Sequence, residues 1–317
     1  MRKNLMWKLA LLVVVLFGYS DAQTTDKETP VQEIPTLPFS LEDSQIRPLR
    51  QLVNKDMQQA LEKQLQKNKA WAKLISRKKM AVGLVDLSDA YHVKFARVNG
   101  SVMMYAASLP KLAILLAAAQ SLEDGTLKET PEVLHDMRIM ISQSDNAAAT
   151  RMIDRMGLER IDQVLTNPHY ELYDPQKGGG LWVGKRFAKT GRRYPDPLMG
   201  ISHGASVTQV CRFYYLLAMG KLVNRERSEQ MLEILKDPEL HHKFVNTLDK
   251  IAPAAELYRK SGTWRNWHAD SALVWGTVWR RYIVAALVED PNGEKILRDL
   301  IPVIEEILKS QDNITSK

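Results

Sequence analysis

The stretch at residues 282–288, with the sequence YIVAALV, decides the fold because it is a short β-branched run bounded by turn residues. Two further runs of this kind precede it, at residues 256–260 and 272–278. A turn at residues 290–293 and an amphipathic run at residues 296–308 follow it. The C-terminal part is therefore predicted to contain three strands and a terminal helix.

The N-terminal part carries the matching elements. Residues 52–75 have apolar positions at helical spacing, and residues 80–87 and 91–98 predict two strands with a short connection. Strands at both ends with helices between them predict an α+β fold, an antiparallel five-stranded sheet flanked by terminal helices. Residues 51–107 and 251–317 form the α/β subdomain of this prediction, and residues 108–250 an inserted all-helical subdomain.

The inserted region contains a long irregular stretch, from about residue 167 to residue 204. It carries Trp182 and six cations: Lys177, Lys185, Arg186, Lys189, Arg192 and Arg193. Structureless segments of this length inside a domain are unusual and often functional. Two interpretations stay open, a solvated surface loop and a rim of the binding pocket.

The N-terminus predicts export. Arg2 and Lys3 precede an apolar stretch that is too short to span a bilayer comfortably, and Ser20-Asp21-Ala22 resembles a cleavage site. Residues 1–22 are therefore predicted to be a signal peptide, and the polar, proline-containing residues 23–50 a linker. An uncleaved N-terminal anchor is the alternative. In both cases the folded part is expected to be periplasmic or extracellular, without stable membrane insertion after cleavage.

Composition excludes several classes. The 317 residues are 26% charged with a formal net charge of +7. The sequence contains no basic patch interleaved with aromatic residues, so it does not indicate a nucleic-acid partner. The basic balance fits solubility or an anionic cell-wall polymer. Cys211 is the single cysteine, so no internal disulfide forms, and its apolar setting predicts a buried thiol. No cofactor and no metal site are expected.

A Ser-x-x-Lys motif at Ser108 and Lys111 opens a very apolar helical run. Side chains three residues apart share one helix face. A serine hydroxyl becomes a nucleophile when a base takes its proton, and a lysine with a lowered pKa can be that base. The helix N-terminus also suits a developing oxyanion. Simple N-capping by Ser108 is the alternative, and a second copy of the motif at Ser76 lies in a solvated, cation-rich hinge.

A second motif, Ser144-Asp145-Asn146, precedes another helical run. Ser144 is a candidate proton relay between Lys111 and a leaving group, and Asn146 a candidate hydrogen-bond partner for a substrate amide. The alternative is that Ser144 or Asp145 caps the helix.

A third motif, Lys260-Ser261-Gly262-Thr263, ends a predicted strand. Gly262 allows a substrate backbone to approach closely. Lys260 offers charge for a substrate carboxylate, and Thr263 offers a backbone N–H. Arg259 and Arg265 flank the motif and are candidate carboxylate ligands. The similar Lys189-Thr190-Gly191 lies in the cationic loop without a strand pattern and is rejected.

The three motifs in this order resemble the penicillin-recognising serine hydrolases, and most closely their class A β-lactamase-like branch. The resemblance covers roughly residues 55 to 310. It implies Ser108 as the acylated nucleophile, Lys111 as its base, Ser144 as proton shuttle and Lys260 as carboxylate or proton partner, with substrate contacts from Asn146, Ser261, Gly262, Thr263 and Arg265. The family's loop glutamate pattern is absent. The acids of the corresponding stretch, Glu171, Asp174 and Asp196, stand in no matching context, which puts efficient deacylation in doubt.

The expected function is therefore that of a secreted serine hydrolase that forms an acyl-enzyme and hydrolyses β-lactams. The alternatives are a D-alanyl-D-alanine carboxypeptidase or penicillin-binding protein, an esterase, and an inactive relative that binds the cell wall. The expected partner is a small-molecule β-lactam or a peptidoglycan peptide, and the expected state is a monomer.

Overall fold

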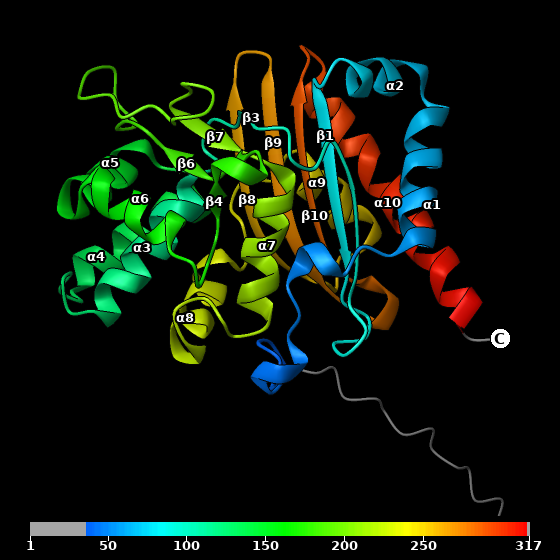
Figure 1. Cartoon of the computed structure of the whole chain (residues 1–317), viewed down its shortest axis with the longest axis horizontal. Coiled ribbons are helices and arrows are strands. Elements are labelled where there is room, and N and C mark those ends of the chain that lie inside the picture. Colours follow the sequence, from blue (N-terminus) through cyan, green and yellow to red (C-terminus); the bar gives the residue numbers. More distant parts are fainter. Residues whose placement is uncertain (1–35, 316–317) are drawn as a thin grey trace, which may run out of the picture. The chain divides into compact units, whose positions relative to one another are not determined.

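Five antiparallel strands form the central sheet of this computed structural model, which describes residues 36–315 (Figure 1). Their order in the sheet is β2-β1-β10-β9-β8. The strands are β1 (Met80–Asp86), β2 (Lys94–Val98), β8 (Glu256–Trp264), β9 (Trp267–Trp275) and β10 (Arg281–Glu289). The N-terminal hairpin joins the C-terminal strands through β1 and β10, with Met80 opposite Val288. The predicted sheet, divided by a long insertion, is confirmed.

The strand ends differ from the prediction. β9 begins at Trp267 and not at residue 272, because polar residues such as Asp270 are buried inside the ladder and hide the apolar pattern. β8 continues through the whole Lys260–Thr263 motif to Trp264, since every one of these residues has a partner on β9.

Helices cover both faces of the sheet. On one face α1 (Lys55–Lys67), α2 (Lys69–Ser76), α9 (Phe244–Ile251) and α10 (Gly293–Thr315) share a hydrophobic core with the strands. On the other face lies α7 (Val207–Ala218), which holds the buried Cys211 (Figure 1). The predicted helical run at residues 52–75 is two helices, because the side chain of Asn68 accepts backbone N–H groups of Ala70 and Trp71 and so starts α2.

The inserted region packs beside the β8 edge of the sheet. Its helices, apart from α7 and α9, are α3 (Lys111–Glu123), α4 (Pro131–Ser142), α5 (Asn146–Met156), α6 (Leu158–Thr166) and α8 (Arg225–Leu235). α3 is buried on nearly all sides, as expected of a helix that is apolar all round. The region also carries short strands that organise the predicted irregular stretch: β4 (Tyr173–Asp174), β5 (Gly179–Gly180), β6 (Trp182–Val183) and β7 (His203–Ala205). The short strand β3 (Met104–Tyr105) comes just before the inserted region and pairs with β7.

Residues 36–50, the described part of the predicted linker, pack against the domain. The Phe39 N–H donates to the Ala218 carbonyl, and Arg225 donates to the carbonyls of Pro38 and Phe39. Leu49 is fully buried. This part of the predicted linker is therefore an ordered element of the fold, with short 3-10 turns at Asp43–Gln45 and Leu49–Gln51. The remaining 3-10 turns are Pro175–Lys177 and Val278–Arg280.

The predicted signal peptide, residues 1–22, lies outside the described residues. Within residues 36–315, no helix combines the length and the apolar character needed to cross a membrane.

Candidate active site

A pocket of about 850 Å³ opens where the β8 edge meets the inserted region. Four of the predicted site residues line it: Ser108, Asn146, Thr263 and Arg265. The rest of the wall includes aromatic rings, from Tyr105, Phe187, Trp264 and Trp267, and basic residues from the loop between β6 and β7. The structure thus brings parts of all three motifs to one concave surface.

Ser108 lies in a tight turn directly before α3. The turn is built by successive short-range bonds, from Leu109 N–H to the Ala106 carbonyl and from Lys111 N–H to the Ser108 carbonyl. Ala107 has a φ of 50°, in the left-handed region that non-glycine residues rarely adopt. Within the described residues the Ser108 hydroxyl makes no hydrogen bond, so the simple capping role is not observed. Ser108 is partly exposed on the pocket wall.

Lys111 is fully buried at the start of α3, one turn after Ser108. Its Nζ donates to the Ser144 carbonyl at 2.6 Å, to Asn146 Oδ1 at 2.8 Å and to the Asp145 carbonyl at 3.2 Å. Burial lowers the pKa of Lys111 to about 7, although the nearby Asp145 carboxylate acts in the opposite direction. A large fraction of this amine is therefore neutral, and able to accept a proton, near pH 7.

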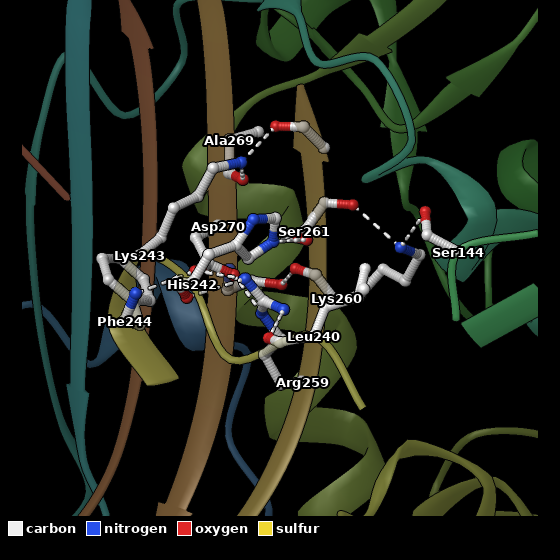
Figure 2. A network of polar contacts seen from close by, with 12 residues as sticks. Ser144, Leu240, His242, Lys243, Phe244, Arg259, Lys260, Ser261, Ala269 and Asp270 are labelled. Atoms are coloured by element: carbon white, nitrogen blue, oxygen red, sulfur yellow. Dashed lines mark hydrogen bonds and ion pairs between the residues drawn. The ribbon is translucent and has the colours of Figure 1, made fainter. Parts of the chain in front are cut away.

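Ser144 lies between two lysines. Its Oγ is 2.9 Å from Nζ of Lys260 and 3.5 Å from Nζ of Lys111. Figure 2 shows Lys260 extending from β8 to this hydroxyl. Ser144 has a φ of 59°, so both site turns contain a residue in a strained conformation, which is common where geometry serves a function. Asp145 caps α5 by accepting the Ala148 N–H, so the capping role of this motif belongs to Asp145 and not to Ser144.

Lys260 does not face the pocket as a free cation. It is almost completely buried, and its Nζ donates to Ser144 Oγ and to the Ser261 carbonyl at 2.8 Å. Burial, together with the charges of Lys111, Arg259 and Lys243, lowers the pKa of Lys260 well below its ordinary value. The arrangement favours a part in proton transfer over direct binding of a substrate carboxylate.

The β8 strand passes very close to the Ser108 turn at Gly262. A Cβ placed on Gly262 would lie 2.1 Å from the Ala106 carbonyl oxygen and 2.7 Å from the backbone nitrogen of Ser108. Both neighbours are backbone atoms that cannot simply move aside. A side chain is therefore excluded at this position. The close approach agrees with the prediction, but the neighbour is the Ser108 turn of the same chain and not a substrate.

The free edge of β8 presents backbone groups to the pocket. The β8–β9 hairpin turns through two residues, and its closing pair, Trp264 and Trp267, is hydrogen-bonded. From this pair onward, hydrogen-bonded pairs alternate with pairs that are not hydrogen-bonded to each other, called open pairs here. Thr263 and Ser261 fall on open pairs, so their N–H and C=O groups point away from β9. The Ser261 carbonyl accordingly accepts a bond from Lys260. The Thr263 N–H and the nearby Ser108 N–H are the available donors for an oxyanion.

A second polar network lies on the opposite side of β8 (Figure 2). Arg259 forms a buried bidentate ion pair with Asp270, at 2.7 and 2.9 Å. Lys243 is fully buried and donates to the Gly262 carbonyl at 2.6 Å and to Thr263 Oγ1 at 2.7 Å. The network clamps the strand that carries the third motif. It also corrects the role offered for Arg259, whose guanidinium is not available to a substrate.

The side chains of the third motif consequently differ in role. The Ser261 hydroxyl bonds to Nε2 of His242 behind the strand, and the Thr263 hydroxyl accepts from Lys243. Arg265 is exposed in the hairpin turn, with a φ of 51°, and lines the pocket. Only Thr263 and Arg265 of this group reach the pocket wall.

None of the three candidate acids lines the pocket. The buried Asp196 carboxylate accepts the Tyr173 hydroxyl at 2.8 Å and the backbone N–H groups of Leu198 and Ile201. Glu171 and Asp174 form ion pairs with Lys177. Among the described residues, no Asp or Glu belongs to the pocket wall.

Sequence reasoning missed several residues of the site. Lys243 follows two histidines ahead of α9 and belongs to no motif, so only strand pairing reveals its role. Phe187, in the cationic loop, covers Nζ of Lys111 with its ring at 4.6 Å. His203 lines the pocket, and burial lowers its pKa to about 4, which leaves it neutral at pH 7. One pattern in the sequence could have identified part of the pocket wall. Trp264 and Trp267 flank the hairpin turn, and both line the pocket.

The described residues contain no group of His, Cys, Asp or Glu side chains arranged to hold a metal ion.

Comparison with solved structures shows the fold. The chain is similar to a class A β-lactamase from Bacteroides cellulosilyticus, with 16% identity, a TM-score of 0.58, and coverage of 81% of this chain and 100% of that one. A variant of PBP-A, solved as an acyl-enzyme complex with penicillin G, is 21% identical with a TM-score of 0.57, covering 84% and 98%. A variant of the TLA-1 extended-spectrum β-lactamase is 12% identical with a TM-score of 0.60, covering 80% and 98%.

No curated protein matches the sequence. The model of the beta-lactamase enzyme family matches residues 129–308, which is more than half of the 317 residues. This match spans the second and third motifs and agrees with the fold. The chain therefore belongs to the beta-lactamase enzyme family, as a hydrolase of the serine β-lactamase type.

Proposed function

We propose that the protein forms an acyl-enzyme on Ser108 with β-lactams. The observation that carries the proposal is the buried Lys111–Ser144–Lys260 chain beneath a pocket that Ser108 lines. The acyl-enzyme of the similar PBP-A variant with penicillin G supports this choice of substrate. Exposed, fully charged lysines would offer no base at neutral pH, whereas Lys111 is buried with its pKa near 7.

The proposed acylation conserves every atom and proton. The Ser108 oxygen attacks the lactam carbonyl carbon while neutral Lys111 takes the hydroxyl proton. The carbonyl oxygen, now negative, is stabilised by the backbone N–H groups of Ser108 and Thr263. The C–N bond then breaks, and the proton passes from Lys111 through the Ser144 hydroxyl to the departing nitrogen. Lys260 holds the Ser144 hydroxyl in position for this transfer.

Deacylation is proposed to be slow. Hydrolysis of the acyl-enzyme needs a base that activates water, and the described pocket wall has no carboxylate. Neutral His203 lines the pocket but is buried, and its Nδ1 faces the Ser202 hydroxyl at 3.1 Å while its Nε2 faces the Lys185 carbonyl. The lack of a carboxylate on the described pocket wall also favours a second candidate function. In it, D-alanyl-D-alanine peptides form a long-lived acyl-enzyme, which is then hydrolysed or transfers its acyl group.

Time-resolved mass spectrometry with a chromogenic cephalosporin and with a D-alanyl-D-alanine peptide tests the proposal. The wild type is expected to gain one adduct on Ser108, and this adduct is expected to remain after the free lactam has been consumed. Ser108→Ala is expected to give none. Ser76→Ala, in the second Ser-x-x-Lys copy, is the matched control and is expected to behave as the wild type. A folded wild type without an adduct from either compound would refute the proposal, and adducts with small esters alone would favour an esterase.

We also propose that the chain is exported, on the basis of its N-terminal residue pattern. Sequencing the N-terminus of the protein recovered from cell fractions tests this. An N-terminus at Gln23 in a periplasmic or extracellular fraction is expected. An intact Met1 in the membrane fraction would favour the anchor instead.

A further inference from the structure

The cations of the predicted irregular loop divide into two sets. Residues 177–193 contain six of them, all within the described part of the chain. Three form ion pairs: Lys177 with Glu171 and Asp174, Arg186 with Asp154, and Arg192 with Glu159. The other three, Lys185, Lys189 and Arg193, have no acidic partner among the described residues, and all three line the pocket. The paired cations fasten the loop to α5, α6 and its own turns. Arg186 is the one of them that also lines the pocket, where Asp154 offsets its charge.

A fourth unpaired cation faces them from another element. Arg265, in the β8–β9 hairpin turn, lines the same pocket, and its guanidinium lies over the Trp264 ring with 5.8 Å to the centroid. We call Lys185, Lys189, Arg193 and Arg265 the cationic rim. The rim therefore converges from two segments that are more than 70 residues apart in the sequence.

The charge of the pocket is not balanced from within. No Asp or Glu contributes to the wall in the described part of the chain, and the buried Lys111 and Lys260 lie beneath it. Concave surfaces lined by one sign of charge focus the electrostatic field and concentrate ligands of the opposite sign. One guanidinium is enough to hold one carboxylate. Four unpaired cations exceed what a substrate with a single carboxylate needs.

We propose that the natural acyl donor is an acidic peptide that carries at least two side-chain carboxylates, which the cationic rim binds while its reacting carbonyl lies at Ser108. The inference rests on the proposed function and names the substrate class of the same site. Aromatic rings between the cations, from Tyr105, Phe187 and Trp267, provide apolar surface for the stems of such side chains.

The test measures equilibrium binding by the Ser108→Ala protein, so that it does not depend on acylation. Two peptides of equal length end in D-alanyl-D-alanine, and one carries two glutamates where the other carries two glutamines. The acidic peptide is expected to bind roughly 10-fold more tightly at low salt, and the preference is expected to shrink at about 0.5 M salt because exposed charges are screened.

A double variant identifies the surface responsible. Lys189→Gln with Arg193→Gln is expected to reduce the preference for the acidic peptide by roughly 3- to 10-fold. Lys63→Gln with Lys67→Gln makes the same change of net charge on exposed lysines of α1, which packs on β2 at the opposite edge of the sheet. This control is expected to keep the full preference.

Equal binding of the two peptides, or an equal loss in both double variants, would overturn the inference. The adduct on wild-type Ser108 is recorded separately with the chromogenic cephalosporin. A missing adduct with an intact charge preference would refute the proposed function alone, whereas an adduct without charge preference would refute the cationic rim alone.

Discussion

Lys111 combines two properties at the scale of a single residue: it is fully buried, and its amine keeps three hydrogen-bond acceptors within 3.2 Å. The acceptors keep the amine in place, and burial keeps its pKa near 7. A lysine in water would be almost entirely protonated at that pH and would not serve as a base. The catalytic proposal therefore depends on an environment and not on the residue type alone.

The pH dependence of acylation follows from this pKa. Because the neutral amine is the active form, the single-turnover acylation rate of Ser108 is expected to rise about 10-fold per pH unit below pH 7 and to level off above it. Lys111→Arg, which stays charged, is expected to lower the rate by about 10²–10⁴ and to remove the rise. Lys63→Arg, on the exposed face of α1, is the control. A wild-type rate that is flat from pH 5.5 to 8.5 would exclude Lys111 as the base.

Sequence patterns identified residues whose chemistry is local and missed residues that act across strands. Ser108 and Lys111 are one turn apart in the chain, so their proximity could be predicted. Lys243 contacts the third motif only because β8 and β9 pair as they do. Asp196 looked like a candidate acid because the sequence does not tell that Tyr173 and backbone amides occupy its carboxylate.

At the scale of elements, the strand β8 and the Ser108 turn behave as one unit. They touch through backbone at Gly262, and Lys243 holds the same residue's carbonyl from behind. The oxyanion donors on the turn and on the strand edge therefore keep a fixed separation. Displacing either element is expected to affect catalysis and stability together.

Gly262→Ala tests this unit. Because the new Cβ would collide with backbone atoms of the Ser108 turn, the variant is expected to lose about 1–3 kcal/mol of unfolding free energy and most of its acylation rate. Gly276→Ala is the matched control, since its Cβ would meet only side-chain atoms at 3.4 Å or more. Urea unfolding and single-turnover acylation measure both effects. Equal stability of the two variants would contradict the close approach.

Element boundaries were predictable where apolar pattern and structure coincide. β10 lies within one residue of the predicted run at each end, because its residues are buried on both faces. β9 was predicted five residues late, since the buried Asp270 pairs with Arg259 on the neighbouring strand and not with anything nearby in sequence. The split between α1 and α2 depends on one capping side chain, Asn68, in an otherwise continuous helical pattern.

At the scale of the described molecule, three buried lysines have lowered pKa values, about 7 for Lys111, about 8 for Lys243 and well below normal for Lys260. The unfolded chain therefore binds more protons than the folded one between these values and about 10.5, and stability rises with pH in that window. Above about pH 10 the slope reverses, because burial raises the pKa of tyrosines such as Tyr170 and Tyr215 to about 12.

The expected outcome is a gain of roughly 3 kcal/mol in unfolding free energy between pH 7.5 and 8.5, with a decline above about pH 10. Urea unfolding followed by tryptophan fluorescence at constant ionic strength measures it. A free energy that falls between pH 7.5 and 8.5 would mean that these lysines remain protonated in the folded protein.

The overall topology was predictable because the sequence predicts strands only near the two ends of the chain. The N-terminal strands could therefore pair only with the C-terminal ones. The placement of the loop between β6 and β7 was not, since its cations look alike in the sequence. Only the positions of Asp154 and Glu159 on α5 and α6 distinguish Arg186 and Arg192, which form ion pairs, from Lys185, Lys189 and Arg193, which do not.

This division within one loop bears on how the protein can diversify. The ion-paired cations maintain the loop's attachment, and the unpaired ones make no contact with an acidic group that their replacement would break. Substitutions of Lys185, Lys189 and Arg193 should therefore cost little folding free energy. Ser108 and the buried lysines stay unchanged. Related chains are free to exchange one preferred substrate for another by changing a few exposed side chains, with the reaction itself preserved.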